Sequence, residues 1–339
     1  MQTLHLTDSE YDLQKAASLL RDGELVAIPT ETVYGLAADA RNGKAVASIF
    51  AAKGRPMDNP LIVHIADMNE LTSLVSEIPS KALALAAAFW PGPLTMIFKK
   101  GGAIPNEVSA GLSTVAVRMP SHPVARQLIR LSGCALAAPS ANRSGIPSPT
   151  DAARVADDMD GRIAAIVDGG ECEVGVESTV IDITGETVHL LRPGAVTVEM
   201  LQTVVGEVKV DDAVLRPLQD GVAAASPGMK YKHYAPAARV ILVKGSPAAY
   251  AADVNAQTTE KAVALCFDGE EALLKIPFLT YGRRDDANEQ AHRLFEALRR
   301  LDDEGFRIAY TACPATDGVG LAVYNRLLRA AGFEVVILE

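Results

Sequence analysis

The feature that most constrains the fold is an alternation of helix-like and strand-like segments, interrupted once between residues 207 and 232. Before the interruption, helices alternate with strands and then strands crowd together, a pattern typical of a mixed α/β sheet with some antiparallel pairs. After it, strands and helices alternate regularly, which predicts a smaller three-layer α/β unit with a mostly parallel sheet. Because 339 residues exceed the usual size of one domain, we expect two domains, over 1–206 and 237–339, joined by a linker over 207–236.

The composition limits the classes of function. The formal net charge is −10, the isoelectric point is near 5.2 and aromatic residues make up 5% of the chain, which argues against broad nucleic-acid or membrane binding. The four cysteines are widely spread and none forms a CxxC pair, so neither a zinc module nor a disulfide framework is expected. No apolar segment approaches ~20 residues and the N-terminus lacks an apolar signal core. We therefore expect a soluble protein of the cytoplasm.

In this acidic chain, a few basic residues stand where helices or strands end. Lys53 and Arg55 lie in KGRPMDNPLIVH, Arg118 lies in STVAVRMP, and Arg192 lies in LLRPG. Cations beside exposed backbone amides suit an anionic ligand. The alternative for the first segment is a simple helix end, because Lys and Arg also complement the C-terminal dipole and a following Gly and Pro stop a helix.

Three polar segments could line the same site as these cations. PTETVYG offers the hydroxyls of Thr32 and Tyr34, or is only a capped turn. APSANRSGIPSPT offers Ser140 and Asn142 to a phosphate or ribose, or is only a loop at a strand end. VGVESTVIDI places Ser178 before a strand, where it either contacts a ligand or belongs to a hairpin turn.

The segment SPGMKYKHYAP, at the end of the expected linker, combines basic and aromatic residues. It is either a solvated tether or a lid whose Tyr231 or Tyr234 closes over a site. The familiar nucleotide signatures are absent from the sequence. There is no GxxxxGKS/T motif, and DGVGLAV in the C-terminal unit lacks the third glycine and the acidic residue of a dinucleotide fingerprint. An anion bound to this chain is thus not held by a P-loop.

Taken together and in order, the motifs PTETVYGL, KGRPMDNPLIVHI, FWPGPLT, VAVRMP, APSANRSG, VGVESTVID, LLRPG and PGMKYKHYAP closely resemble those of the threonylcarbamoyl-AMP synthase family. The first seven resemble its YrdC-like catalytic domain, and the last resembles the linker of the long form, which carries an extra C-terminal domain. The resemblance implies a YrdC-like twisted mixed sheet with helices and an open concave cavity. A smaller, Rossmann-like three-layer α/β domain would follow it.

The resemblance also implies a reaction. L-Threonine, bicarbonate and ATP, with Mg²⁺, would give threonylcarbamoyl-AMP, diphosphate and water. Partner enzymes would then transfer the threonylcarbamoyl group to the adenosine next to the anticodon of tRNA. Because three negatively charged reactants must be held together, cations are required, and we expect Lys53, Arg55, Arg118 and Arg192 to converge in one cavity.

The same resemblance implies roles residue by residue. Threonine binding is implied for Thr32, His64, Arg118, Ser178 and the backbone of Ala138. ATP binding is implied for Arg55, Asn59, Thr114, Ser140, Ser148, Arg192 and Tyr234. Lys53 and Arg55 would be the catalytic residues, with Lys53 near the phosphates or the bicarbonate, and Tyr34 and Asn142 would support the site. No dedicated protein ligands are implied for the metal ion.

Other functions stay open at this stage. A concave basic face could hold double-stranded RNA without catalysis, although the acidic net charge and the few aromatic residues count against such a module. Related domains carry out carbamoyl-adenylate chemistry in hydrogenase maturation, but they have CxxC zinc modules and an acylphosphatase-like segment that this chain lacks. The C-terminal unit could also be a nucleotide-binding switch, although it has no phosphate fingerprint.

Overall fold

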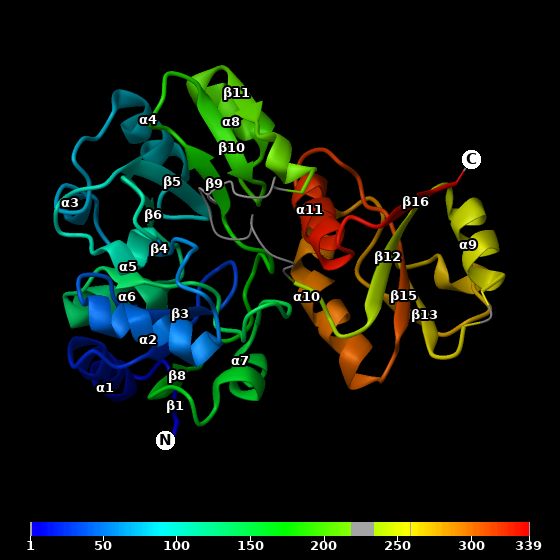
Figure 1. Ribbon diagram of the computed structural model, residues 1–339, viewed down its shortest axis with the longest axis horizontal. Helices are drawn as coiled ribbons and strands as arrows, with labels where there is room; N and C mark the ends of the chain where they lie inside the picture. The colour runs from blue at the N-terminus through cyan, green and yellow to red at the C-terminus, as the bar shows by residue number, and fades with distance from the viewer. Residues whose placement is uncertain (1, 218–233, 258, 339) are drawn as a thin grey trace.

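The computed structural model describes residues 2–217, 234–257 and 259–338, which form two α/β domains around two separate sheets (Figure 1). The first sheet has eleven strands in the order β1-β8-β2-β3-β7-β4-β6-β5-β9-β10-β11. These strands are β1 (Leu4–Leu6), β2 (Val26–Ile28), β3 (Gly35–Asp39), β4 (Ile62–His64), β5 (Leu94–Lys99), β6 (Thr114–Arg118), β7 (Leu136–Ala137), β8 (Ala165–Val167), β9 (Thr179–Asp182), β10 (Val188–Arg192) and β11 (Val208–Val210). Parallel and antiparallel neighbours both occur, so the predicted mixed sheet is confirmed.

Helices cover this sheet and bury its apolar side chains. They are α1 (Glu10–Arg21), α2 (Gly43–Lys53), α3 (Met68–Leu71), α4 (Ser80–Phe89), α5 (Asn106–Ser109), α6 (Pro123–Ser132), α7 (Ala152–Met159) and α8 (Val198–Val205). The largest core cluster joins residues of α2, α4 and the central strands. A second cluster lies between α1, α6 and the strands near the N-terminal edge of the sheet.

Helix α2 shows how the sequence fixes the position of the first two cations. The side chain of Asn42 accepts hydrogen bonds from the first backbone amides of the helix and caps its N-terminus. Gly54, at φ +62°, ends the helix in the left-handed conformation that glycine adopts without strain. Lys53 is therefore the last residue of the helix, and Arg55 lies just beyond the cap.

The second sheet is entirely parallel, with the order β14-β13-β15-β12-β16. Its strands are β12 (Arg239–Lys244), β13 (Ala262–Cys266), β14 (Phe278–Thr280), β15 (Ile308–Ala312) and β16 (Val335–Ile337), and its helices are α9 (Pro247–Asn255), α10 (Ala287–Asp303) and α11 (Gly320–Ala330), with a 3₁₀ turn η2 (Glu271–Leu273). Figure 1 shows α10 and α11 on the side that faces the first domain and α9 on the other side, so the predicted three-layer unit is confirmed. None of the helices within the described residues has the length and apolar character that a membrane crossing requires.

The segment between the two sheets differs in part from the expected linker. Residues 207–236 begin with β11, which pairs in parallel with β10 and forms the edge of the first sheet, and continue with a 3₁₀ turn η1 (Asp212–Val214). This strand is too short to show a period of its own, and pairing with β10 defines it. Most of SPGMKYKHYAP, including Tyr231, lies outside the described residues, which resume at Tyr234.

The two domains are joined by close packing as well as by the chain. Val33 and Val176 of the first domain belong to the same core cluster as the interior of the second. Gly175, at φ +81°, lies so close to α10 that an added Cβ would be 2.4 Å from the Cα of His292. Arg299 of α10 donates to Asp158 of α7 at 2.7 Å, and both side chains are buried. The side of the second domain that carries α10 and α11 is therefore an interface.

Candidate active site

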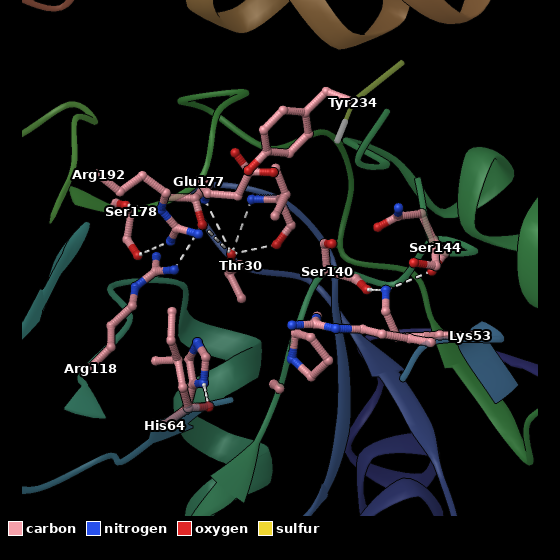
Figure 2. Close-up of a pocket in the computed structure, with 18 of the residues that line it drawn as sticks. Thr30, Lys53, His64, Arg118, Ser140, Ser144, Glu177, Ser178, Arg192 and Tyr234 are labelled. Carbon is pink, nitrogen blue, oxygen red and sulfur yellow. Dashed lines mark hydrogen bonds between the residues drawn. The ribbon is translucent and has the colours of Figure 1, made fainter. Parts of the chain in front are cut away.

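A cavity opens on the first sheet, where segments far apart in the sequence meet (Figure 2). Most of the residues singled out from the sequence line it: Thr32, Lys53, Arg55, His64, Arg118, Ala138, Ser140, Asn142, Ser178, Arg192 and Tyr234. Figure 2 shows Arg118 and Arg192 on one side of the cavity and Lys53 on the other. The expected convergence of the four cations is therefore present, and it could hold several anionic groups at once.

Strand register brings one end of the cavity together. β4 pairs with β6 so that His64 lies opposite Arg118, and β5 places Thr95 opposite Arg118 from the other side. Directly paired residues of neighbouring strands point to the same face of a sheet. Thr114, at the start of β6, shares this face by alternation but does not line the cavity.

Arg118 is buried and already oriented by the protein. Its Nη1 donates to the Thr32 hydroxyl at 2.8 Å, and its Nη2 forms an ion pair with Glu31 at 2.7 Å. Burial alone would raise the pKa of Glu31, but the neighbouring Arg118 guanidinium holds that pKa below its ordinary value. A second carboxylate, from a ligand, would meet a guanidinium whose position is fixed in advance.

His64 lies beside Arg118 as a neutral ring. Burial, assisted by the positive charge of Arg118, lowers the pKa of His64 to about 3. Its Nδ1 lies 3.2 Å from the carbonyl oxygen of Ile62. His64 can therefore offer a hydrogen bond at neutral pH, but it adds no positive charge.

Ser178 holds Arg192 on this side of the cavity. Its hydroxyl lies 2.8 Å from the hydroxyl of Thr95 and accepts a hydrogen bond from Nη2 of Arg192 at 3.1 Å. Nε of Arg192 donates to the backbone carbonyl of Ser178 at 3.0 Å. The last residue of β10 and the residue before β9 are thereby held in one arrangement.

Lys53 is engaged with the opposite wall rather than extended into the cavity. Its Nζ donates to the carbonyl oxygens of Ser140 at 2.5 Å and Asn142 at 2.6 Å. Burial, together with the nearby charge of Arg55, holds the pKa of Lys53 well below its ordinary range. The Asn142 amide donates to the carbonyls of Arg143 and Ile146. Lys53 and Asn142 thus fix the polar turn that presents Ser140.

Four of the expected residues do not line the cavity: Tyr34, Asn59, Thr114 and Ser148. The hydroxyl of Tyr34 donates to the carbonyl of Gly170 at 2.8 Å and so stabilises the loop that contains Gly170. Ser148 donates to the Glu177 carboxylate at 2.5 Å, immediately behind the wall. Asn59 is fully buried, and neither polar atom of its side chain has a hydrogen-bond partner within the described residues.

The sequence-derived set omits several lining residues, among them Thr30, Ser144 and Glu177. Thr30 lies in the motif PTETVYG and Ser144 in APSANRSG, so the other residues of these motifs could have pointed to both. Glu177 is contacted from behind by Arg326 of α11, which the motifs do not mark. No sequence motif marks Arg326. The structure reveals it, because its side chain is buried at 0% exposure on a helix that contacts the first domain.

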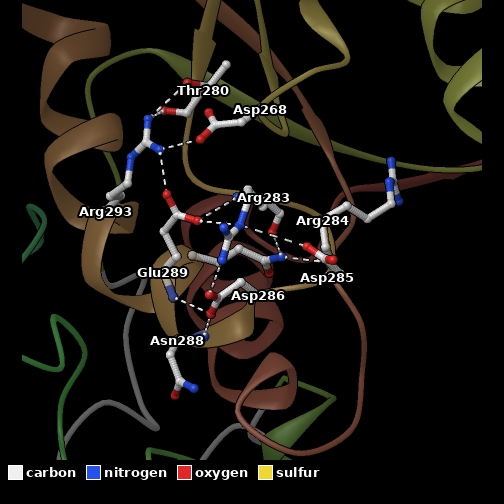
Figure 3. Close-up of polar contacts among 10 residues, drawn as sticks. Asp268, Thr280, Arg283, Arg284, Asp285, Asp286, Asn288, Glu289 and Arg293 are labelled. Carbon is white, nitrogen blue, oxygen red and sulfur yellow. Dashed lines mark hydrogen bonds and ion pairs between the residues drawn. The ribbon is translucent and has the colours of Figure 1, made fainter.

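A second place for a ligand would be the carboxyl edge of the parallel sheet, where Rossmann-like folds bind nucleotides. There, Arg293 is bonded to Asp268 at 2.6 Å and to the Thr280 hydroxyl at 3.0 Å (Figure 3). Arg283 is bonded to Asp286 at 2.6 Å. Carboxylates of the same domain already pair with these two guanidinium groups, and both side chains are far more exposed than that of Arg118. This edge therefore supports a nucleotide site less well than the cavity does.

Comparisons with known proteins agree with this geometry. A family model described as telomere recombination, for Sua5, YciO and YrdC, matches residues 18–194, and a model of the threonylcarbamoyl-AMP synthase C-terminal domain matches residues 196–332. The threonylcarbamoyl-AMP synthase of Pyrococcus abyssi is 45% identical over 332 residues, which is 96% of each chain. That of Bacillus subtilis is 45% identical over 338 residues, covering 98% of this chain and 97% of the relative.

A solved structure extends the likeness to three dimensions. Sua5 of P. abyssi, crystallised in complex with L-threonine, has a TM-score of 0.93 and 43% sequence identity, with all of both chains covered. The likeness in sequence and in structure thus spans both domains. This chain therefore belongs to the threonylcarbamoyl-AMP synthase family.

Proposed function

We propose that this protein is an L-threonylcarbamoyladenylate synthase, a nucleotidyltransferase that converts L-threonine, bicarbonate and ATP to threonylcarbamoyl-AMP, diphosphate and water. The observation that carries the proposal is the convergence of Lys53, Arg55, Arg118 and Arg192 on one cavity of an otherwise acidic protein. A carboxylate, a bicarbonate ion and a triphosphate repel one another, and preorganised cations offset that repulsion.

Threonine would bind at the end of the cavity formed by Arg118. The guanidinium of Arg118 would pair with the amino-acid carboxylate, while Thr32, His64, Ser178 and the Ala138 backbone would surround the rest of the ligand. The complex of the P. abyssi relative with L-threonine supports this ligand. The neutral ring of His64 suits a hydrogen bond to an uncharged hydroxyl, and a lost hydrogen bond discriminates between substrates more strongly than a lost methyl group.

ATP would occupy the remainder of the cavity, where Arg55, Ser140, Arg192 and Tyr234 lie. Asn59 would act on ATP through Arg55, whose Nη2 lies 3.5 Å from the carbonyl oxygen of Asn59. Thr114 and Ser148 would act from the edge of the site. Tyr34, Lys53 and Asn142 would support it by holding the loops, and the charge of Lys53 would lie near the phosphates or the bicarbonate.

The reaction then depends on positioning. The neutral amine of threonine attacks the carbon of bicarbonate, and loss of water leaves a carbamate. A carbamate oxygen attacks the α-phosphorus of ATP as the bond to the β-phosphate oxygen breaks, and diphosphate leaves. Such transfers rely on alignment and charge neutralisation more than on covalent help from the protein.

Mg²⁺ would enter with ATP and neutralise part of the phosphate charge. Within residues 2–217, 234–257 and 259–338, no group of three His, Cys, Asp or Glu side chains is suited to hold a metal ion. The cavity carboxylate Glu177 is bonded to Ser148 and Arg326. We therefore propose that phosphate oxygens and water supply the ligands. The product would pass to the enzymes that modify tRNA, so we propose that the protein works in the cytoplasm.

Diphosphate release tests the proposal. The purified protein with ATP and Mg²⁺ should release diphosphate only when threonine and bicarbonate are both present, and omission of either should reduce the rate to background. The product should be identified by mass spectrometry. Release that ignores threonine, or RNA binding without any release, would contradict a synthase.

A further inference from the structure

Glu177 is an unexpected component of a cavity that gathers anions. Its side chain is buried at 7% exposure and lines the same wall as Ser178 and Arg192. Oε1 accepts a hydrogen bond from Ser148 at 2.5 Å. A negative charge in this wall would oppose the binding of a triphosphate unless another group neutralised it.

The neutralising group comes from the other domain. Arg326 of α11 is fully buried and donates from Nε to Oε2 of Glu177 at 2.9 Å and from Nη2 to the Glu177 carbonyl at 3.1 Å. Its Nη1 donates to the carbonyl of Pro193 at 2.7 Å. One guanidinium thus holds the residue before Ser178 and the residue after Arg192, and its carbon lies 5.7 Å from the centre of the Tyr234 ring.

Other charged and titratable groups also face Glu177. Arg192 on β10, Lys53 on α2 and Tyr234 at the end of the segment between the domains interact with it electrostatically. Arg326 makes the direct ion pair. Burial would raise the pKa of Glu177, and Arg326 is the foremost of the groups that instead hold that pKa below its ordinary value.

We propose that Arg326, contributed by the C-terminal domain, is a positioning residue of the nucleotide site, which neutralises Glu177 and so allows the cavity to accept the triphosphate of ATP. This inference rests on the proposed function and deepens it. The C-terminal domain thereby supplies part of the electrostatics of a cavity that the first domain and Tyr234 line. A role limited to joining the two domains would not select ATP over threonine.

Isosteric variants of the two partners distinguish these roles, because they change the local charge in opposite directions. In Arg326→Gln, the unpaired carboxylate should raise the KM for ATP and weaken binding of a non-hydrolysable ATP analogue by about tenfold. In Glu177→Gln, the unpaired guanidinium should tighten analogue binding. The double variant should return to within about threefold of the unmodified protein. The KM for threonine should change much less in all three.

The pH dependence of analogue binding gives a second test of the role of Arg326. In Arg326→Gln, ionisation of Glu177 with rising pH should progressively weaken binding of the analogue relative to the unmodified protein. Addition of Glu177→Gln should remove that dependence. The matched control is Arg154→Gln, which breaks ion pairs between the domains with Glu296 and Asp303, does not line the cavity and should leave ATP binding unchanged.

Weaker analogue binding in both single variants, or an equal rise in both KM values, would reduce Arg326 to a structural contact and overturn the inference. If Arg326→Gln does not fold, Glu177→Gln compared with the double variant decides, since only the former should bind the analogue more tightly than the unmodified protein. Absence of diphosphate release from the unmodified protein would instead refute the proposed function, and analogue binding would still test Arg326.

Discussion

At the scale of single residues, the cations of the cavity differ in the groups that surround them. Arg118 is fixed by Glu31 and Thr32. Arg55 makes a longer contact, with Nη2 at 3.5 Å from the carbonyl of Asn59, and lies over the Phe50 ring. We expect Arg118, whose position is fixed, to anchor a small carboxylate, and Arg55 to bind ATP.

Separate titrations of the two substrates test this division. Arg118→Ala should weaken the use of threonine, and Arg55→Ala should weaken the use of ATP. Each should cost about 1.5–3 kcal/mol, the range for a hydrogen bond to a charged group. Arg130→Ala, on an exposed part of α6, is the control and should change neither titration. Unaltered apparent affinities in both cavity variants would contradict the assignment.

The free energy of unfolding, measured by chemical denaturation, separates the effect of Arg118 on folding from its effect on threonine binding. Removal of Arg118 leaves the Glu31 carboxylate buried without its ion pair, which typically costs about 3–5 kcal/mol. Addition of Glu31→Gln should recover stability without restoring the affinity for threonine.

At the scale of elements, helices and strands with a regular apolar pattern or a clear cap can be predicted from the sequence more readily than short edge strands. The alternation of segments predicted both sheets, and Gly54 with Pro56 predicted the end of α2. β11 and β14 were not predicted, because each is a short strand at the edge of its sheet and is defined by the one neighbour it pairs with. The motifs led to most of the cavity. They could not lead to Arg326, because its partner Glu177 lies 149 residues away and no local pattern joins the two.

The tight contact between the segment around Gly175 and α10 supports a prediction at this scale. Gly175→Ala would place a methyl group 2.4 Å from the Cα of His292 and force a left-handed backbone on alanine. Gly170→Ala, at φ +85° with open space around it, carries only the backbone strain. We expect both to lower the free energy of unfolding, and Gly175→Ala to lower it by about 1–3 kcal/mol more, as overpacking does. Chemical denaturation measures the difference, and equal losses would mean that the two domains can separate locally.

At the scale of the whole molecule, ionic contacts tie the two domains into one unit. Arg154 of α7 is bonded to Glu296 and Asp303 of α10, and Arg299 of α10 is bonded to Asp158. The buried apolar cluster that includes Val33 and Val176 is continuous with the second core. We expect the two domains to unfold together.

Two adjacent arginines of α10 test how much the buried contact contributes. Arg299→Ala leaves Asp158 buried without its partner and should cost about 3–5 kcal/mol. Arg300→Ala removes an exposed pair with Glu304 and should cost less than about 0.5 kcal/mol. Urea unfolding of both variants gives the comparison. A small loss in Arg299→Ala, or a second transition in the unmodified protein, would argue for domains that are stable independently.

The pairing of Glu177 with Arg326 also affects how the chain folds during its synthesis on the ribosome. The carboxylate emerges 149 residues before the guanidinium that will meet it. At typical rates of synthesis, the interval is about 7–30 s. During that time the nascent N-terminal half lacks its interdomain counter-charge, so this wall of the nucleotide pocket reaches its final form only when translation is nearly complete.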